Sequence, residues 1–244
     1  NTLTTRFTRS VATGRDLKQI ANGAPVKGNE VRADAVWHSD QEEAEKADQT
    51  TRILVAAKAG STPDFRPVQL ATLVDTVPAG DNWLFEMKYD GYRCLAAVRG
   101  RSVRLFTRSG LDWTDKFVSL VEPLQKLKIG SALIDGEICA FDGKGRTDFS
   151  TLKNVLSNGG RLEFFAFDLL EADGKDLARL PLIERKKSLE KLLAKSGKDD
   201  PIQYSSHVVG HGQKVLDALC REGHEGVIAK RADAPYRGER SKSW

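Results

Sequence analysis

The sequence lacks the features that mark membrane and secreted proteins. No apolar run approaches the roughly 20 residues that a membrane-spanning helix needs. The N-terminal residues also lack the apolar segment of a signal peptide. The single methionine, Met87, lies well inside the chain, so we expect the chain to be a segment of a larger protein. These absences predict a soluble protein of the cytoplasm that makes no membrane contact.

Cysteine is also scarce, and its spacing argues against zinc. The three cysteines, Cys94, Cys139 and Cys220, are widely spaced, whereas zinc sites use closely spaced pairs. Each lies among apolar neighbours, so we expect three buried free thiols. The net charge of +4 suits a polyanionic partner but is too small to identify one.

The chain divides into two parts by composition. Residues 1–65 lack sustained periodicity and are rich in Thr, Ala, Gly, Asp and Glu, which is typical of an extended arm or interdomain linker. We expect short helices near 14–21 and 39–47 within it. Residues 66–244 read as a domain of short strands, tight turns and a few helices. Strands interrupted by helices without regular alternation favour an α+β fold with a mainly antiparallel sheet.

Several elements of this domain are predicted by turn residues and periodicity. Strands at 94–98 and 103–107 flank a hairpin turn. Strands at 132–134 and 137–141 lead to a turn at 142–145, and the apolar run at 162–170 predicts a buried strand. Leucine spacing and glycine stops predict a helix from Leu182 to Gly197 after Pro181, and another over 213–222 ended by Gly223.

The most informative segment is Glu-Met-Lys-Tyr-Asp-Gly-Tyr-Arg at residues 86–93. A lysine among phosphate-binding groups is a candidate nucleophile, but only its neutral amine can attack. Arg93 and a bound divalent cation would both disfavour the ammonium form of Lys88. Taken alone, the segment also fits a surface lysine at a β-turn, because Asp-Gly is itself a turn signal.

Four further motifs follow this segment in order. They are Thr-Arg-Ser-Gly at 107–110, Leu-Ile-Asp-Gly-Glu at 133–137, Phe-Ala-Phe-Asp-Leu-Leu at 165–170 and Glu-Gly-Val-Ile-Ala-Lys at 225–230. Together the five runs resemble motifs I, Ia, III, IIIa and IV of the ATP-dependent DNA ligases, which are covalent nucleotidyltransferases. The segments at 66–73, 113–117 and 148–150 resemble the ligase module of the bacterial end-joining enzyme DNA ligase D. The resemblance covers about residues 66–244.

This resemblance implies an adenylation domain in which two mainly antiparallel sheets, with helices outside, form a nucleotide cleft. It implies that Lys88 attacks the α-phosphate of ATP to give lysyl-AMP, and that AMP then passes to the 5′-phosphate of a DNA nick or break. The implied cofactors are ATP and Mg²⁺ or Mn²⁺. The implied partners are DNA, repair domains fused in the parent chain and an end-binding protein, in DNA repair by non-homologous end joining.

The resemblance also assigns roles to eight residues. It assigns the nucleotide to Glu86 through its backbone, Lys88, Arg93, Glu137, Phe167 and Lys230, the DNA 5′-phosphate to Arg108, and the metal to Glu225 with Glu137. These residue types suit the roles, because guanidinium groups bind phosphate, carboxylates bind ribose hydroxyls and Mg²⁺, and an aromatic ring stacks on a base. For Phe167, a place in the core is the alternative. We expect Asp135 to shape a turn and to take no part in the chemistry.

The sequence also departs from the family, and other functions stay open. Ligases continue past a run like Ser-Lys-Ser-Trp at 241–244 into a lysine pair and an oligonucleotide-binding barrel, both absent here. We therefore expect a largely built nucleotide pocket and impaired nick sealing. One alternative is an RNA ligase or a messenger-RNA capping nucleotidyltransferase, which shares the lysine motif. Another is a module that binds adenylate or DNA ends without turnover.

Overall fold

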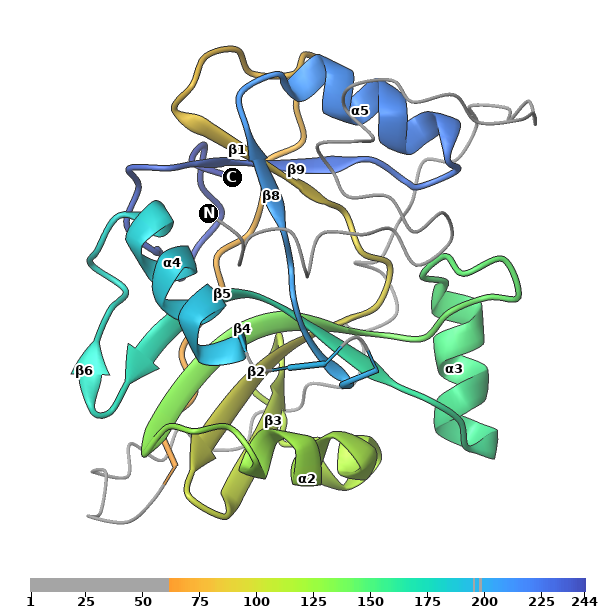
Figure 1. The fold of residues 1–244 in the computed structure, drawn as a ribbon, viewed down its shortest axis with the longest axis vertical. Helices are drawn as coiled ribbons and strands as arrows, with labels where there is room; N and C mark the ends of the chain where they lie inside the picture. Colours follow the sequence, from red (N-terminus) through yellow and green to blue (C-terminus); the bar gives the residue numbers. More distant parts are fainter. Residues whose placement is uncertain (1–61, 195, 198) are drawn as a thin grey trace.

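The computed structural model describes residues 62–194, 196–197 and 199–244 (Figure 1). The predicted arm or linker, with its two short helices, falls almost wholly outside these residues. Its last residues already belong to the packed domain, because the rings of Phe65 and Phe106 have centroids 5.8 Å apart. Within the described part of the chain, no helix is long and apolar enough to cross a membrane.

The larger sheet has the strand order β3-β2-β4-β5-β6, and β7 pairs with β5 (Figure 1). Only the β5–β7 pairing is parallel among these strands, so the predicted antiparallel sheet is confirmed in its main part. The predicted hairpin is also confirmed, and its turn contains Gly100 at a φ of 55°, where a side chain would be strained. The strands are β2 (Tyr92–Arg99), β3 (Ser102–Thr107), β4 (Ser131–Cys139), β5 (Glu163–Ala172), β6 (Lys175–Asp176) and β7 (Ile202–Tyr204).

Alternate side chains of the larger sheet enter two separate cores, as the two-residue repeat of a strand requires. On β2, Cys94 and Ala96 join the cluster that contains Phe117, whereas Leu95 and Ala97 join a second cluster on the other face. Helices contribute to the first cluster, namely η1 (Thr114–Phe117), α2 (Val118–Gln125), α3 (Phe149–Asn158) and α4 (Leu182–Leu193). Because both faces are covered, the strands are apolar along most of their length.

The smaller sheet, with the order β8-β1-β9, lies at the top of Figure 1 under helix α5. Its antiparallel strands are β8 (His207–Val209), β1 (Trp83–Met87) and β9 (Val227–Arg231), and α5 spans Gly212–Arg221. Phe85 of β1 packs with Val215 and Leu219 of α5 in a third core. A Cβ atom at Gly212 would lie 2.2 Å from the Phe85 ring, so the close approach of helix and strand requires glycine there.

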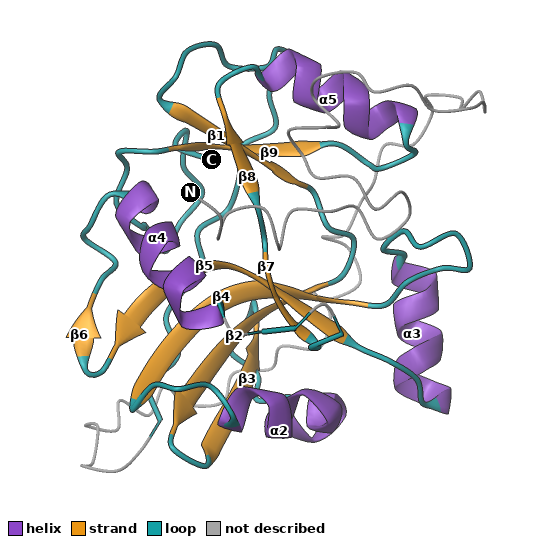
Figure 2. Ribbon diagram, viewed as in Figure 1, coloured by secondary structure: helices purple, strands orange, loops and turns teal. Residues whose placement is uncertain are grey.

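Helix α3 (Phe149–Asn158) lies at the right edge of the larger sheet in Figure 2. Asp148 caps it, because its carboxylate accepts a hydrogen bond of 2.6 Å from the Thr151 amide. The predicted helices at 182–197 and 213–222 are also present. The first ends earlier than expected, at Leu193, and the second is followed by Gly223 at a φ of 80°.

Two expectations from the sequence are wrong. Asp135 and Gly136 do not break the chain between two strands but lie inside the single strand β4. Gly136 serves close packing there, because a Cβ atom would lie 2.5 Å from the Phe164 ring. Cys94 and Cys139 are buried as expected, but Cys220 is exposed. It lies beside the buried stripe of α5, on the side of the helix that faces solvent.

The two ends of the described domain pair with each other. The amide of Leu70 donates to the Glu239 carbonyl at 3.1 Å, and the amide of Thr72 donates to the Trp244 carbonyl at 3.0 Å. The buried Gln69 side chain adds hydrogen bonds to the Arg237 amide and the Ser241 hydroxyl. This pairing fixes the position of the Trp244 indole.

Candidate active site

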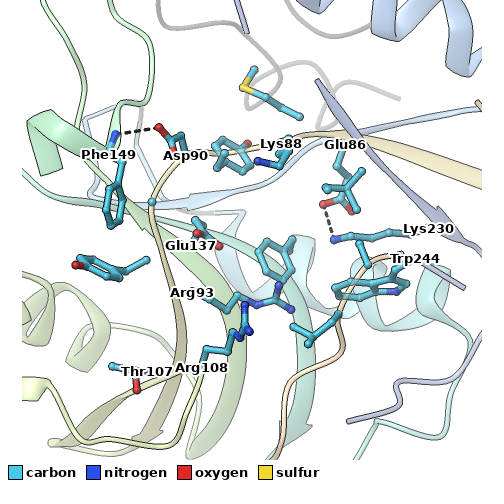
Figure 3. A pocket seen from close by; sticks show the side chains of 18 of the residues that line it. Glu86, Lys88, Asp90, Arg93, Thr107, Arg108, Glu137, Phe149, Lys230 and Trp244 are labelled. Atoms are coloured by element: carbon cyan, nitrogen blue, oxygen red, sulfur yellow. Dashed lines mark hydrogen bonds and ion pairs between the residues drawn. The ribbon is translucent and has the colours of Figure 1, made fainter. Parts of the chain in front are cut away.

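A cavity of about 570 Å³ is lined by residues of both sheets. Of the eight predicted site residues, seven line it, and Figure 3 shows several of their side chains gathered around one space. Glu225 does not line it directly but contacts Lys88, which does. The structure therefore brings the predicted residues together, although they are spread over 145 positions of the chain, from 86 to 230. Those lining the cavity are Glu86, Lys88, Arg93, Arg108, Glu137, Phe167 and Lys230.

Lys88 follows the last residue of β1, the central strand of the smaller sheet. Its amide donates to the Gly226 carbonyl at 3.0 Å, and its Nζ atom forms an ion pair with Oε2 of Glu225. Side-chain exposures of 33% for Lys88 and 41% for Glu225 leave both groups in contact with solvent. The motif at 225–230 thus places a carboxylate on the candidate nucleophile.

The other fixed residues of the lysine motif position the chain. The Asp90 amide donates to the Thr147 hydroxyl at 3.1 Å, and the Asp90 carboxylate accepts a bond of 3.0 Å from the amide of Phe149, the first residue of α3 (Figure 3). Burial raises the pKa of the Asp90 carboxyl. A Cβ atom at Gly91 would lie 2.2 Å from the Ile138 carbonyl oxygen. Asp90 and Gly91 therefore fix the loop that carries Lys88 against β4 and α3.

Arg93 is held by a buried carboxylate that sequence reasoning assigned to a turn. Its Nε and NH2 atoms donate to the two oxygens of Asp135 at 2.6 and 2.8 Å, and NH2 also reaches the Gln69 carbonyl at 3.2 Å. The Tyr236 hydroxyl donates to the same carboxylate at 2.6 Å. Burial acts to lower the pKa of Arg93, but Asp135 outweighs it and raises the pKa. Asp135 thus orients the guanidinium group and does not form a turn.

Glu137 is the carboxylate placed next to Arg93. The two residues are directly paired across β4 and β2, and Glu137 lines the cavity. Burial raises the pKa of Glu137 to about 7, against the attraction of Arg93 and with the help of the nearby carboxylate of Asp135. The group can therefore accept or hold a proton near neutral pH, which suits contact with a hydroxyl group or a cation.

Phe167 lines the cavity, but its ring is already covered. The Arg93 guanidinium carbon lies 4.4 Å from the ring centroid, and the Lys230 amine lies 4.1 Å from it. The Trp244 indole packs edge-on with a centroid distance of 6.0 Å, and Phe167 is 6% exposed. A stacked base would have to take the place of one of the two cations, so stacking on Phe167 stays a prediction.

Glu86 uses its side chain inside the protein. Its carboxylate forms ion pairs with Lys186 at 2.7 Å and Lys230 at 2.9 Å, and the second pair is visible in Figure 3. Burial acts to raise the pKa of Glu86, but the two lysines outweigh it and bring the pKa to about 2. Burial lowers the pKa of Lys230 to about 8, although Glu86 opposes this. Glu86 therefore stays ionised and anchors the two lysines.

Sequence reasoning missed two basic residues of α4, Arg185 and Lys186. Both are fully buried, and Arg185 pairs with Asp168 at 2.7 Å. The signal was present in the sequence, because both positions lie on the stripe that Leu182 and Leu189 define at helical spacing. A basic pair inside an apolar stripe indicates buried partners, since an unpaired charge is costly to bury.

The donor set near Lys88 fits a magnesium ion that is shared with a nucleotide. Within residues 62–194, 196–197 and 199–244, no three His, Cys, Asp or Glu side chains form a cluster that could hold a metal alone. Mg²⁺ commonly uses one or two protein carboxylates and completes its shell with substrate phosphates and water. Glu225 is ion-paired with Lys88, and Glu137 lines the same cavity as Lys88, so two carboxylates are available there.

Comparison with known proteins decides the family. Residues 68–244 match the model of the ATP-dependent DNA ligase domain. The chain belongs to the ATP-dependent DNA ligase family. A multifunctional non-homologous end joining protein LigD of Pseudomonas aeruginosa is 37% identical over 185 residues, which are 75% of this chain and 22% of that protein. A LigD of Mycobacterium tuberculosis is 37% identical over 66% of this chain and 21% of its own length. The chain thus spans about a fifth of the length of these relatives.

Solved structures give the same family and fold. The ligase domain of M. tuberculosis LigD matches with a TM-score of 0.64 and 35% identity, over 72% of this chain and 58% of that one. A mycobacterial DNA ligase D in complex with ATP and MES matches with a TM-score of 0.62 and the same identity and coverage. The Chlorella virus DNA ligase-adenylate matches with a TM-score of 0.54 at 19% identity, which shows the fold alone. The expected adenylation-domain fold of two antiparallel sheets with helices is therefore confirmed.

Proposed function

We propose that residues 66–244 catalyse ATP-dependent adenylation of Lys88 as the first step of DNA ligation. The Lys88 amine attacks the α-phosphorus of ATP. The new N–P bond replaces the bond from that phosphorus to the bridging oxygen, pyrophosphate leaves, and the amine gives up one proton. The product is a lysyl-AMP phosphoramide. A DNA 5′-phosphate oxygen then attacks the same phosphorus and releases the lysine, and a 3′-hydroxyl displaces AMP to form the phosphodiester bond.

The cavity supplies a group for each part of the nucleotide. Arg93 and Glu137 offer donors and an acceptor to the ribose, and the Phe167 ring and the backbone at Glu86 are the candidates for adenine. Lys230 lies where its ammonium can meet the α-phosphate, which gains negative charge as the N–P bond forms. Fixed cations that stabilise developing charge are commonly the largest contribution to catalysis of this kind. Arg93 is well suited because the two hydrogen bonds that it donates to Asp135 fix its orientation before substrate arrives.

Glu225, together with Glu137, would hold the Mg²⁺ or Mn²⁺ that the family uses. A bound divalent cation neutralises phosphate charge and disfavours the ammonium form of a neighbouring lysine. The Glu225 carboxylate that would hold the cation is the one that is ion-paired with Lys88 in the free protein.

Arg108 is the proposed ligand of the DNA 5′-phosphate. It lines the same cavity as Lys88, together with Thr107 and Lys153. We infer from the LigD relatives that the DNA is a nick or a double-strand end and that the reaction serves non-homologous end joining. On the same ground, we propose repair domains in the parent chain and an end-binding protein as partners.

The observation that carries this proposal is the joint placement of Lys88, Arg93 and Glu137 on the wall of one cavity. Incubation of the chain with α-³²P-labelled ATP and a divalent cation should transfer label to the protein, and mass spectrometry should locate AMP on Lys88. Lys88→Ala should abolish labelling and leave the circular dichroism spectrum unchanged. Label on another lysine would contradict the assignment.

Two controls separate this function from its alternatives. Lys187→Ala, which removes an exposed lysine of α4, should label as the wild type does. Labelled GTP in place of ATP should give no adduct, whereas a capping-type enzyme would prefer it. Nucleotide binding without any covalent adduct, at all times and cation concentrations tested, would indicate a binding module instead.

A further inference from the structure

One buried carboxylate in the wall of the cavity is shared by two buried lysines. Oε1 of Glu86 lies 2.7 Å from Nζ of Lys186, and Oε2 lies 2.9 Å from Nζ of Lys230. The side chains of all three are at most 3% exposed. The Ser205 hydroxyl donates a further hydrogen bond of 3.1 Å to Oε2. Two cations therefore depend on one anion in a place that water scarcely reaches.

The two lysines differ in what else they contact. Lys186 donates to the carbonyls of Phe167 and Ser205 at 3.3 and 3.0 Å, and its third contact is the ion pair with Oε1 of Glu86. It does not line the cavity. Lys230 does line it, and beyond Glu86 its amine faces two aromatic rings, with centroid distances of 4.1 Å to Phe167 and 4.2 Å to Trp244.

This difference determines which of the two lysines can leave Glu86 and bind a ligand in the cavity. A phosphate group in the cavity can attract Lys230 at the cost of one ion pair and two ring contacts. If Glu86 had no second cation, that movement would leave a buried carboxylate without a counterion, which is strongly unfavourable. Lys186 prevents this, because it remains on Oε1 whatever Lys230 does.

We propose that Lys186 is a positioning residue for nucleotide binding, because it neutralises Glu86 from outside the cavity and so frees Lys230 to bind a nucleotide phosphate. This inference rests on the proposed function and extends it to a residue that cannot touch the nucleotide. Its role depends on charge: Lys186 matters to the phosphate only as long as Glu86 is a carboxylate.

The test compares a ligand with phosphates and a ligand without them. Dissociation constants of α,β-methylene-ATP, which cannot transfer AMP, and of adenosine are measured on the full chain by calorimetry and NMR titration. Lys186→Gln should weaken binding of the triphosphate analogue about tenfold, as expected for loss of a charged hydrogen bond. Adenosine binding should change less than about twofold, since no phosphate is involved. Lys187→Gln, the exposed neighbour, should change neither constant.

A second background distinguishes a charge role from a structural one. In the Glu86→Gln background, adding Lys186→Gln should change the ratio of the dissociation constant of the triphosphate analogue to that of adenosine by less than about twofold. No carboxylate remains there to be neutralised. Equal weakening of both ligands in both backgrounds would show that Lys186 only supports the fold, and would overturn the inference. The double variant carries neither the Glu86 nor the Lys186 charge. It can therefore still be compared with Glu86→Gln if Lys186→Gln alone does not fold. Failure of the wild type to bind the analogue would instead overturn the proposed function, and the inference with it.

Discussion

Replacing Glu137 by glutamine should stabilise the folded protein at pH 8 and do so much less at pH 5. Burial raises the pKa of Glu137 from 4.5 to about 7 in the folded state. Between these two values the folded protein holds a proton that the unfolded chain has lost. Stability is therefore lost as the pH rises through the folded pKa. Glutamine does not ionise, so the variant avoids this loss.

The structure sets the size of the effect. One pKa unit corresponds to about 1.4 kcal/mol, so the full difference would be worth roughly 3 kcal/mol. The carboxyl lines an open cavity, and water there lowers the cost of ionisation. We therefore expect Glu137→Gln to raise the free energy of unfolding by about 1–3 kcal/mol at pH 8. Urea denaturation at pH 5 and pH 8, followed by circular dichroism, measures both values.

A matched control isolates the contribution of the site. Glu239→Gln removes an exposed carboxylate of the same type, and its effect on stability should stay within about 0.5 kcal/mol at both pH values. If Glu137→Gln destabilises the protein at pH 8, the attraction of Arg93 exceeds the cost of burial. The carboxylate would then be a stabilising ion in the free protein, and our reasoning about its pKa would be wrong.

Three further predictions concern the other charged groups. Asp135→Asn should lower the free energy of unfolding by about 3–5 kcal/mol, as loss of a buried partner of Arg93 implies, and a loss below 1 kcal/mol in denaturant titrations would contradict the anchoring role. Adenylation by Glu225→Ala should recover with added Mg²⁺, because mass action refills a weakened site, whereas Glu137→Ala should recover little. The reverse pattern would exchange the two roles. Arg108→Ala should leave lysyl-AMP formation within about twofold but reduce transfer of AMP to nicked DNA at least about tenfold in single-turnover assays, and an equal loss in both steps would refute its assignment to DNA.

The residues that touch the cavity were predictable from the sequence because their chemistry is local. Lys88 and Arg93 share one short motif, and Glu137, Phe167 and Lys230 each belong to a run that resembles a ligase motif. Turn signals and apolar periodicity also gave the main strands and two helices, since each depends on neighbours within a few positions.

The residues that position the cavity were not predictable, because their partners lie far away in the chain. Asp135 appeared to form a turn with Gly136. Instead it lies inside β4, where its carboxylate accepts a hydrogen bond from Arg93, 42 positions earlier in the chain. Lys186 was not singled out by the sequence. Its carboxylate partner Glu86 is 100 positions away, on the other sheet. Local sequence patterns do not contain these pairings, although a charge inside an apolar stripe signals that one exists.

The pairings give the free protein a definite electrostatic state. Three cations that would meet a nucleotide are already matched with a carboxylate: Lys88 with Glu225, Arg93 with Asp135, and Lys230 with Glu86. To bind a phosphate, each cation must leave its carboxylate. The affinity for phosphate therefore depends on whether that carboxylate is then solvated or paired with another cation.

The three carboxylates differ in this respect. The Glu225 side chain is 41% exposed and can take water or a metal ion, so the pair with Lys88 is the easiest to separate. Asp135 is fully buried and holds Arg93 by two hydrogen bonds, so that pair stays together and Arg93 binds through its remaining donors. Glu86 is equally buried, yet it can release Lys230, because Lys186 stays on its other oxygen. The order of exposure thus makes Lys88, the proposed nucleophile, the cation that separates most easily from its carboxylate, and Arg93, the proposed ribose ligand, the one held most firmly, which is the division that attack on a bound nucleotide requires.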